Sequence, residues 1–156
     1  PNVRMVLLKG LSNKGFVFYT NFNSKKGGEL KENQKASMCF HWKSLRRQVR
    51  AIGKVEEVSA KEADDYFNSR PYKNKIGAWA STQSKILDKR ELFLNKIKEF
   101  EKKYPNENNV PRPPHWSGWR LLPDEVEFWL DGDGRIHERL NYKKKNGKWE
   151  KELLYP

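Results

Sequence analysis

Three side chains near the C-terminus combine charge with a regular spacing that could build a ligand site. Arg135, His137 and Arg139 alternate along residues 135–144, and alternate residues of a β-strand point to the same face. Arginine can stack on a flat ring and can also donate paired hydrogen bonds. The spacing therefore predicts a wall of a site for an anionic or electron-rich ligand. A solvated face of an open sheet is the alternative interpretation.

Two further cations, Arg4 and Lys9, bracket an apolar segment at the start of the chain. A phosphate would bind well there, because each charge-assisted hydrogen bond contributes roughly 1.5–3 kcal/mol. Trp129 lies in another apolar run and could either belong to the core or pack against a ligand ring. Together these residues indicate a basic pocket lined by aromatic side chains, without naming a cofactor or a reaction.

Several other kinds of site are excluded by the sequence. The chain contains no GxxxxGK[ST] phosphate loop, GxGxxG dinucleotide motif, HExxH zinc motif or GxSxG nucleophile motif. The DGDG segment at 131–134 resembles the start of a calcium loop, but Tyr142 stands at the twelfth position, where a bidentate glutamate is required. His41, His115 and His137 lack the spacing of metal ligands, so we expect no metal site.

Charge and composition narrow the class of protein further. The chain has 156 residues, with 32 Lys+Arg against 20 Asp+Glu, a net charge of +12 at pH 7 and 13% aromatic residues. This surplus attracts polyanions or phosphorylated small molecules. The aromatic content argues against disorder, and no apolar run is long enough to span a membrane or patterned as a leader. Cys39 has no partner for an internal disulfide, so we expect a cytoplasmic protein.

Strands are expected to dominate the elements that hold these residues. Apolar or alternating runs bounded by turn residues predict strands at 3–9, 16–21, 36–42, 47–59, 119–122, 126–130, 135–144 and 149–155. Helical patterns predict helices over 26–33, 60–69 and 88–103, and capping boxes at Ser59 and Asp88 precede the last two. Strands follow strands along the chain, which predicts a mainly β domain, an antiparallel barrel with appended helices.

Six sequence blocks resemble a known family. They are RMVLLK at 4–9, FYTN at 18–21, RRQVRAIGKVE at 46–56, YFNSRP at 66–71, IGAWAS-x-QS at 76–84, and EFW followed by RIHER within 127–139. In this order and near this spacing, they resemble pyridoxamine 5'-phosphate oxidase, also called pyridoxine 5'-phosphate oxidase, over nearly the whole chain. The resemblance implies a single FMN-binding split β-barrel domain over residues 1–156. It also implies a homodimer with FMN at the subunit interface.

The resemblance assigns residues to a flavin site and to a substrate site. The implied FMN-binding residues, some of them from the partner subunit, are Arg4, Met5, Val6, Leu7, Leu8, Lys9, Tyr19, Thr20, Lys25, Lys26, Gln48, Gln83, Ser84, Trp129 and Arg139. The substrate phosphate would be held by Lys9, Tyr66 and Arg70. Arg135 and His137 would flank the pyridine ring of the substrate and form the implied catalytic pair.

The implied reaction removes a hydride from the substrate carbon that bears an alcohol or an amine. The flavin accepts the hydride, and dioxygen then reoxidises the flavin and becomes hydrogen peroxide. Pyridoxine 5'-phosphate or pyridoxamine 5'-phosphate would thereby become pyridoxal 5'-phosphate. Arg135 would hold the ring in line with the flavin.

The chain departs from the family pattern at three places. Lys25 stands where arginine is usual, so the positive charge is kept but FMN phosphate binding would be looser. Asn74 stands beside the substrate phosphate, where a small hydroxyl residue is common. The family also carries several dozen residues before the first strand, part of which can fold over the substrate, whereas Pro1 lies almost at that strand. A naturally short chain would close poorly over substrate and still bind FMN.

Two other functions are compatible with parts of the sequence. A flavin-binding barrel could act on a different substrate or serve as a carrier, although the five implied substrate residues favour the oxidase. A nucleic-acid-binding barrel is suggested only by the net charge of +12 and the aromatic residues. Its affinity would fall steeply as the salt concentration rises. We expect phosphorylated B6 vitamers and dioxygen as partners, and neither nucleic acid nor a membrane.

Overall fold

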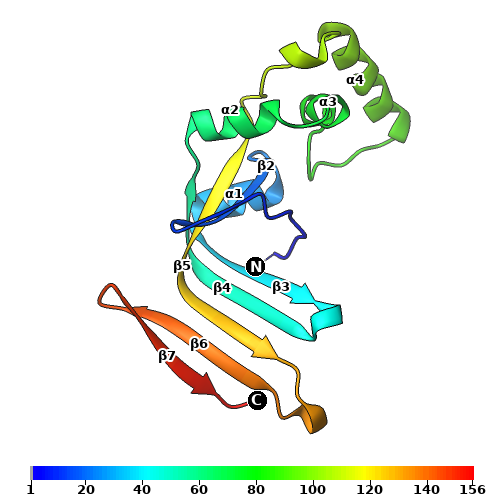
Figure 1. Cartoon of the computed structure of the whole chain (residues 1–156). Coiled ribbons are helices and arrows are strands. Elements are labelled where there is room, and N and C mark those ends of the chain that lie inside the picture. The colour runs from blue at the N-terminus through cyan, green and yellow to red at the C-terminus, as the bar shows by residue number, and fades with distance from the viewer. Residues whose placement is uncertain (1) are drawn as a thin grey trace.

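The computed structural model describes residues 2–156, which form a curved, seven-stranded antiparallel sheet and four α-helices (Figure 1). The strands are β1 (Gly10–Ser12), β2 (Gly15–Asn21), β3 (Lys35–Trp42), β4 (Arg47–Glu57), β5 (Trp116–Leu130), β6 (Glu138–Lys145) and β7 (Lys148–Leu154). The helices are α1 (Lys25–Glu32), α2 (Ala60–Asn68), α3 (Tyr72–Ala80) and α4 (Arg90–Lys103), and short 3-10 turns are η1 (Lys43–Leu45), η2 (Glu107–Asn109) and η3 (Asp133–Arg135). Helices α2, α3 and α4 gather at one end, and the β6–β7 hairpin forms the other (Figure 1). Within residues 2–156, no helix has the length and apolar character needed to cross a membrane.

Strand β5 is the centre of the sheet and joins its two ends. The first half of β5 pairs with β2 and the second half pairs with β6, while β4 runs along the opposite edge. The sequence predicts two separate strands here, at 119–122 and 126–130, but the structure has one. Pro123 lies opposite Gly53 beside a register shift, where a residue that lacks an N–H group can be accommodated within a strand.

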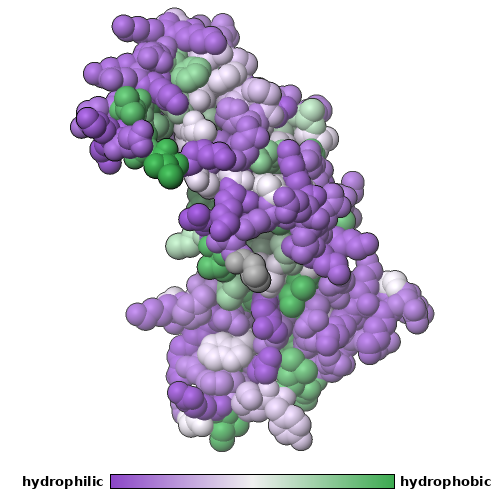
Figure 2. Space-filling view, turned by 180° about the vertical axis from the view of Figure 1, so that it is seen from behind, coloured by the Kyte–Doolittle hydropathy of each residue, from purple (hydrophilic) through white to green (hydrophobic). Residues whose placement is uncertain are grey.

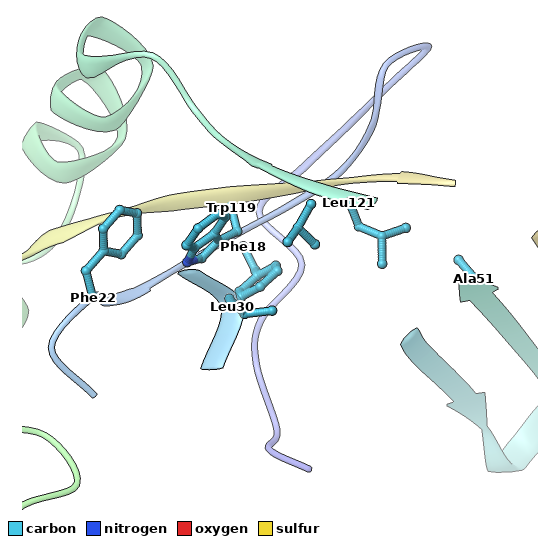
Figure 3. Close-up of a cluster of buried hydrophobic side chains, with 7 residues drawn as sticks. Phe18, Phe22, Leu30, Ala51, Trp119 and Leu121 are labelled. Atoms are coloured by element: carbon cyan, nitrogen blue, oxygen red, sulfur yellow. The ribbon is translucent and has the colours of Figure 1, made fainter. Parts of the chain in front are cut away.

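The main hydrophobic core lies where β2, β4 and β5 meet α1. Its buried members are Phe18, Phe22, Leu30, Ala51, Val55, Trp119 and Leu121 (Figure 3). The Trp119 ring is 1% exposed and stacks on Phe22 with the ring centroids 5.0 Å apart. A second cluster of Phe67, Ile76, Val110 and Trp116 packs α2 and α3 against the start of β5. The second cluster fixes the helical end to the sheet, and the first fixes α1.

Most elements predicted from the sequence are confirmed. Strands β2, β3, β4 and β7 and helices α1 and α2 lie within a few residues of their predicted bounds. Ser59 caps α2 because its hydroxyl accepts the Glu62 N–H at 3.2 Å, as the capping box predicts. The turn at Asn146 and Gly147 joins β6 to β7, with φ of 49° and 79° at these residues, as expected of an Asn-Gly hairpin turn.

The predicted strand over 3–9 is wrong. Residues 2–9 belong to no strand or helix, and the first strand begins at Gly10. The pairing of β1 with β2 ends at Gly10 opposite Val17, and before this point the chain leaves the edge of β2 instead of continuing the ladder. Only the Lys9 N–H reaches the sheet, at 2.9 Å from the Val17 carbonyl oxygen, and the Met5 and Leu7 side chains stay exposed.

The helical end contains two further differences from the sequence prediction. No helix is predicted over α3, because its apolar positions are too few to give a clear periodicity, and the structure buries Lys75 together with Ile76 and Ala80. Asp88 does not cap α4. The N-cap position is Lys89, which makes no side-chain cap bond, so the helix begins one residue later than a capping box at Asp88 requires.

Candidate functional site

A basic pocket of about 530 Å³ opens between β2, the helical end and the N-terminal segment. Ten residues that the sequence assigns to the site line it: Met5, Val6, Leu7, Lys9, Tyr19, Thr20, Lys26, Tyr66, Arg70 and Gln83. Asn74 also lines the pocket, beside residues that the sequence analysis does not assign: Asn21, Lys73, Gly77, Ala78, Ser81, Phe93 and Trp116. No Asp or Glu among residues 2–156 contributes to the lining, so the pocket carries positive charge that an anion can neutralise.

The first turn of α1 positions Lys26 in this basic pocket. The Ser24 hydroxyl caps the helix by accepting the Gly27 N–H at 3.1 Å, and it donates to the Asn21 carbonyl oxygen at 2.6 Å. A Cβ atom added at Gly27 would lie 2.4 Å from the carbonyl oxygen of Phe22. Glycine is therefore needed here for the close approach of helix and strand, although the residue lowers helix propensity.

Lys26 begins a chain of polar contacts across the pocket. Its Nζ donates to the Thr20 Oγ1, and the Thr20 hydroxyl donates to the Gln83 Oε1 at 3.4 Å. Burial lowers the pKa of Lys26 to about 8, and the nearby positive charge of Arg4 adds to this effect. Lys26 is thus a desolvated cation that an incoming anion would stabilise in its charged form.

Three stacked aromatic rings form one side of the basic pocket. Tyr19 stacks on Tyr66 with centroids 4.1 Å apart and on Trp116 with centroids 5.2 Å apart. The Tyr19 ring can lie this close to β5 because Gly118 is opposite; a Cβ there would lie 2.8 Å from the ring. Burial raises the pKa of Tyr19 to about 12, with a smaller contribution from Glu62, so the hydroxyl stays protonated and donates to the Glu62 carbonyl oxygen at 3.4 Å.

Arg70 offers the pocket an unused hydrogen-bond donor. Its guanidinium carbon lies 4.7 Å from the Trp116 ring centroid and 5.5 Å from that of Phe67, so cation–π contacts hold the group in place. Its Nη1 atom is buried and has no hydrogen-bond partner among the described residues. Burial lowers the pKa of Arg70. A buried guanidinium nitrogen without a partner among residues 2–156, in a pocket whose described lining holds no carboxylate, is suited to an anionic oxygen.

A second group of predicted site residues lies at the far end of the sheet. Gln48 pairs with Trp129 across β4 and β5, and Trp129 pairs with Arg139 across β5 and β6. The His137 ring packs on Trp129 with centroids 4.7 Å apart. We call Gln48, Trp129, His137 and Arg139 the distal cluster. Gln48 and Trp129 also line a mainly apolar pocket of about 440 Å³.

The basic pocket and the distal cluster are too far apart within one chain to share one small ligand. Trp116 lines the basic pocket and Trp129 belongs to the distal cluster, and both lie on β5. Thirteen residues of strand correspond to roughly 40 Å, somewhat less where the strand curves. The predicted site residues therefore fall into two halves.

The prediction that Arg135, His137 and Arg139 share one strand face is wrong. Strand β6 begins only at Glu138, and Arg135 lies in η3 with a φ of 65°. The turn after β5 continues into η3 instead of closing directly at the DGDG segment. The Arg135 side chain is exposed, whereas the His137 ring packs on Trp129. The two side chains therefore do not lie on a common strand face.

Besides His137, six predicted residues line neither pocket: Arg4, Leu8, Lys25, Ser84, Arg135 and Arg139. Arg4 lies close enough to Lys26 to affect its pKa, while Leu8, Lys25 and Ser84 are exposed. Arg139 is engaged within the chain: its Nε donates to Glu127 at 2.9 Å and its Nη1 to the Tyr155 carbonyl oxygen at 2.9 Å. These contacts set the orientation of Arg139 in the distal cluster.

Solved structures identify the class of protein. The chain matches the structure of PhzG from Burkholderia lata 383 in complex with tetrahydrophenazine-1-carboxylic acid with a TM-score of 0.91 and 30% identity, over 98% of this chain and 74% of that one. It matches a pyridoxamine 5'-phosphate oxidase-related, FMN binding protein from Nostoc punctiforme with a TM-score of 0.75, 16% identity and coverage of 98% and 80%. The fold is that of the FMN-binding split-barrel proteins.

Sequence comparisons identify the family within this class. Residues 1–104 match the family model described as pyridoxamine 5'-phosphate oxidase, and residues 116–156 match the pyridoxine 5'-phosphate oxidase C-terminal dimerisation region. Pyridoxine/pyridoxamine 5'-phosphate oxidases from Pelagibacter ubique and Sinorhizobium fredii are 62% and 53% identical to the chain, which they match over its full length and 76% of theirs. The chain belongs to the pyridoxamine 5'-phosphate oxidase family, as the six sequence blocks predict.

Proposed function

We propose that the chain is an FMN-dependent oxidase that converts pyridoxine 5'-phosphate or pyridoxamine 5'-phosphate to pyridoxal 5'-phosphate and reduces dioxygen to hydrogen peroxide. The observation that carries this proposal is the basic pocket, where Lys9, Lys26, Arg70 and Lys73 meet without a carboxylate in the described lining. Both ligands of the proposed reaction carry a phosphate. The names of the relatives at 62% and 53% identity support the same activity.

The donor set of the basic pocket fits the phosphate end of FMN. Lys26 and Arg4 lie close together near Thr20 and Gln83, and no carboxylate in the described lining neutralises them. We propose that these residues hold the FMN phosphate, that Lys25 adds charge beside it, and that the backbone segment from Met5 to Leu8 lies along the flavin. Gln48, Trp129 and Arg139 would contact the ring system from the other half of the site.

The orphan guanidinium nitrogen of Arg70 fits the phosphate of the substrate. Lys9 lies 5.8 Å from the Tyr66 ring centroid, so Lys9, Tyr66 and Arg70 border the same part of the pocket. We propose that these three residues bind the substrate phosphate, with Asn74 as an additional donor. Arg135 and His137 would then bind the pyridine ring from the distal end of a second subunit.

A homodimer would unite the two halves of the site. The chain contains a C-terminal dimerisation region at residues 116–156, which includes most of the distal cluster. Met5 is 102% exposed and Leu153 is 83% exposed, and apolar patches interrupt an otherwise hydrophilic surface (Figure 2). Burial of such side chains between subunits is favourable. We propose that the basic pocket of one subunit faces the distal cluster of its partner, with FMN between them.

The residues of the chain would bind, orient and shield the reactants. FMN supplies the two-electron acceptor that takes a hydride from the substrate and returns the electrons to dioxygen. The residues that bind the two phosphates would fix FMN and the substrate relative to each other. Arg135 and His137 would orient the substrate carbon that loses the hydride. Pyridoxine 5'-phosphate and dioxygen give pyridoxal 5'-phosphate and hydrogen peroxide. Pyridoxamine 5'-phosphate also consumes one water and releases ammonia.

The proposed function is tested by the spectrum and by product formation. After incubation with FMN and removal of unbound FMN, the protein should be yellow and show a flavin absorbance spectrum. Addition of pyridoxine 5'-phosphate without oxygen should bleach the flavin, and air should restore the colour with release of one hydrogen peroxide per pyridoxal 5'-phosphate. A protein that refuses FMN, or a bound flavin that neither phosphorylated vitamer reduces, contradicts the proposal.

FMN affinity should weaken as the pH rises above about 8. Lys26 loses its proton as the pH passes its lowered pKa of about 8, whereas a phosphate monoester stays dianionic over this range, since its second pKa is about 6. We therefore expect the dissociation constant to rise about tenfold between pH 7 and 9.5, as measured by flavin fluorescence. The Lys26→Arg variant keeps its charge and should show a nearly flat profile, and Lys73→Arg serves as the matched control with the wild-type slope.

A flavin-binding protein with a different substrate is the second candidate. PhzG, which is 30% identical to the chain, was solved in complex with tetrahydrophenazine-1-carboxylic acid, a ligand without phosphate. The anaerobic assay separates the two candidates: reduction of the flavin by such a tricyclic acid, but by neither B6 phosphate, favours the second. The unpaired Arg70 donor favours the first, because a phosphate ester satisfies it.

A further inference from the structure

Asp131, the first residue of the DGDG segment, lies at the centre of a charged network beside His137. Its Oδ2 accepts the Nε–H of Arg46 at 2.8 Å, and its backbone N–H donates to the Arg46 carbonyl oxygen at 3.0 Å. Its Oδ1 lies 3.1 Å from the Nδ1 of His137. Arg46 thus holds Asp131 through its side chain and through its backbone, and the carboxylate faces one particular nitrogen of the imidazole.

Two groups compete for the Nδ1 atom of His137. The Gly132 N–H lies 3.2 Å from Nδ1 and would require it to be an unprotonated acceptor, whereas the Asp131 carboxylate requires it to carry a proton. A bond between an N–H and a charged carboxylate is roughly twice as strong as one between neutral partners. The Arg46 guanidinium holds the pKa of Asp131 below its usual range, and the Gly132 N–H also lowers it. The carboxylate therefore stays charged and can accept from both Gly132 and His137.

The other imidazole nitrogen is available to a ligand. No group among residues 2–156 forms a hydrogen bond with the Nε2 of His137, and the ring is held by Trp129 with centroids 4.7 Å apart. An imidazole protonated on Nδ1 has a lone pair on Nε2 and accepts a hydrogen bond there. Asp131 and Trp129 thus set the orientation of the ring and the position of its proton, and Nε2, on the opposite edge of the ring, can bind a ligand.

We propose that Asp131, clamped by Arg46, is a positioning residue that fixes His137 as the Nδ1–H tautomer, so that Nε2 accepts a hydrogen bond from the hydroxyl or amine of the bound substrate. The first part, the tautomer, depends only on this chain. The second part rests on the proposed function, because it requires that His137 meets the substrate.

The tautomer is tested on the purified protein without substrate. Two-dimensional ¹H–¹⁵N spectra of the ring nitrogens at about pH 9, above the usual range of histidine titration, distinguish a protonated from an unprotonated nitrogen. The chain has three histidines, and the His137→Gln variant identifies the relevant signals. We expect a protonated Nδ1 in the wild type and in Asp131→Asn, whose amide oxygen can still accept, and a switch to protonated Nε2 in Asp131→Ala. A protonated Nε2 in the wild type overturns the proposal.

The positioning role is tested by anaerobic stopped-flow reduction of the FMN-loaded protein with pyridoxamine 5'-phosphate. Asp131→Ala should slow flavin reduction about tenfold with FMN affinity unchanged, and Asp131→Asn should recover most of the rate. Asp133→Ala is the matched control, because Asp133 lies on the same turn and also faces Arg46, at 3.5 Å. An unchanged rate in Asp131→Ala contradicts the role of the residue. If no vitamer reduces the flavin bound to the wild-type protein, the proposed function is contradicted instead. The NMR measurement still decides whether Asp131 fixes the Nδ1–H tautomer of His137.

Discussion

Replacement of Arg70 by alanine is expected to weaken binding of pyridoxine 5'-phosphate about a hundredfold while FMN affinity changes less than about threefold. Arg70 carries the buried donor that has no partner among residues 2–156, and a charge-assisted hydrogen bond to phosphate contributes roughly 1.5–3 kcal/mol. At 1.4 kcal/mol per factor of ten, this corresponds to a loss of roughly 10- to 150-fold. Titration of the FMN-loaded protein with substrate and titration of the unloaded protein with FMN measure the two affinities separately.

The Arg70→Lys variant separates loss of charge from loss of packing. Arg70 stacks on Trp116 and Phe67, so alanine removes cation–π contacts as well as a donor. Lysine keeps the charge without the paired donors and should recover part of the substrate affinity. Equal losses of FMN and substrate affinity in Arg70→Ala would show that the proposed division of the site into a flavin half and a substrate half is wrong.

Replacement of Glu127 by alanine is expected to lower the free energy of unfolding by about 3 kcal/mol. The Glu127 side chain is 3% exposed and lies between two guanidinium groups: Arg139, with Nε at 2.9 Å, and Arg50 on the neighbouring strand. Removal of one partner from a buried ion pair leaves uncompensated charge and typically costs 3–5 kcal/mol. We place the effect at the lower limit because Arg50 and Arg139 are partly exposed to solvent. Urea denaturation at matched protein concentrations measures the free energy of unfolding.

Glu125→Ala is the matched control for Glu127→Ala. Glu125 lies on the same strand, but its ion pair with Lys143 spans 3.8 Å near the surface, so its loss should cost less than about 1 kcal/mol. The pKa of Glu127 is lowered, chiefly by its hydrogen bond to Arg139. Its stabilisation is therefore complete above the ordinary glutamate pKa of about 4.3 and disappears as the pH falls through the lowered value. Acid unfolding that is equally steep in the wild type and in Glu127→Ala contradicts this assignment.

Local sequence patterns predicted the elements that are stabilised within one chain. The strand β2 and helix α2 were predicted because their turn and cap residues act on neighbouring backbone groups. The segment 3–9 was wrongly predicted as a strand, because its apolar pattern is typical of a strand, whereas the chain leaves the edge of β2 before Gly10. Similarly, Arg135 and Arg139 were predicted on one strand face, because no local signal indicates that the turn continues into η3.

The resemblance identified residues that the structure brings together in the basic pocket. It named ten residues of this pocket, including Lys26 and Arg70, from segments far apart in the sequence. It did not indicate Trp116 or Phe93 as lining residues. In the sequence, nothing distinguishes Trp116 from a core residue. It lines the pocket because its ring stacks with Tyr19 of β2 and Tyr66 of α2. The role of Asp131 also needed coordinates, because its contact with Arg46 spans 85 positions along the chain.

The central place of β5 orders events in time while the chain is being synthesised. Strand β2 ends at Asn21. Its partner β5, which pairs with residues 16–21 of β2, ends only at Leu130. At 5–20 residues per second, about 5–20 s separate the emergence of the two strands from the ribosome. During this interval the edge of β2 and the apolar Phe18 lack their eventual partners, which is the situation that favours pairing with another nascent chain. The sheet can therefore close only after most of the chain has emerged.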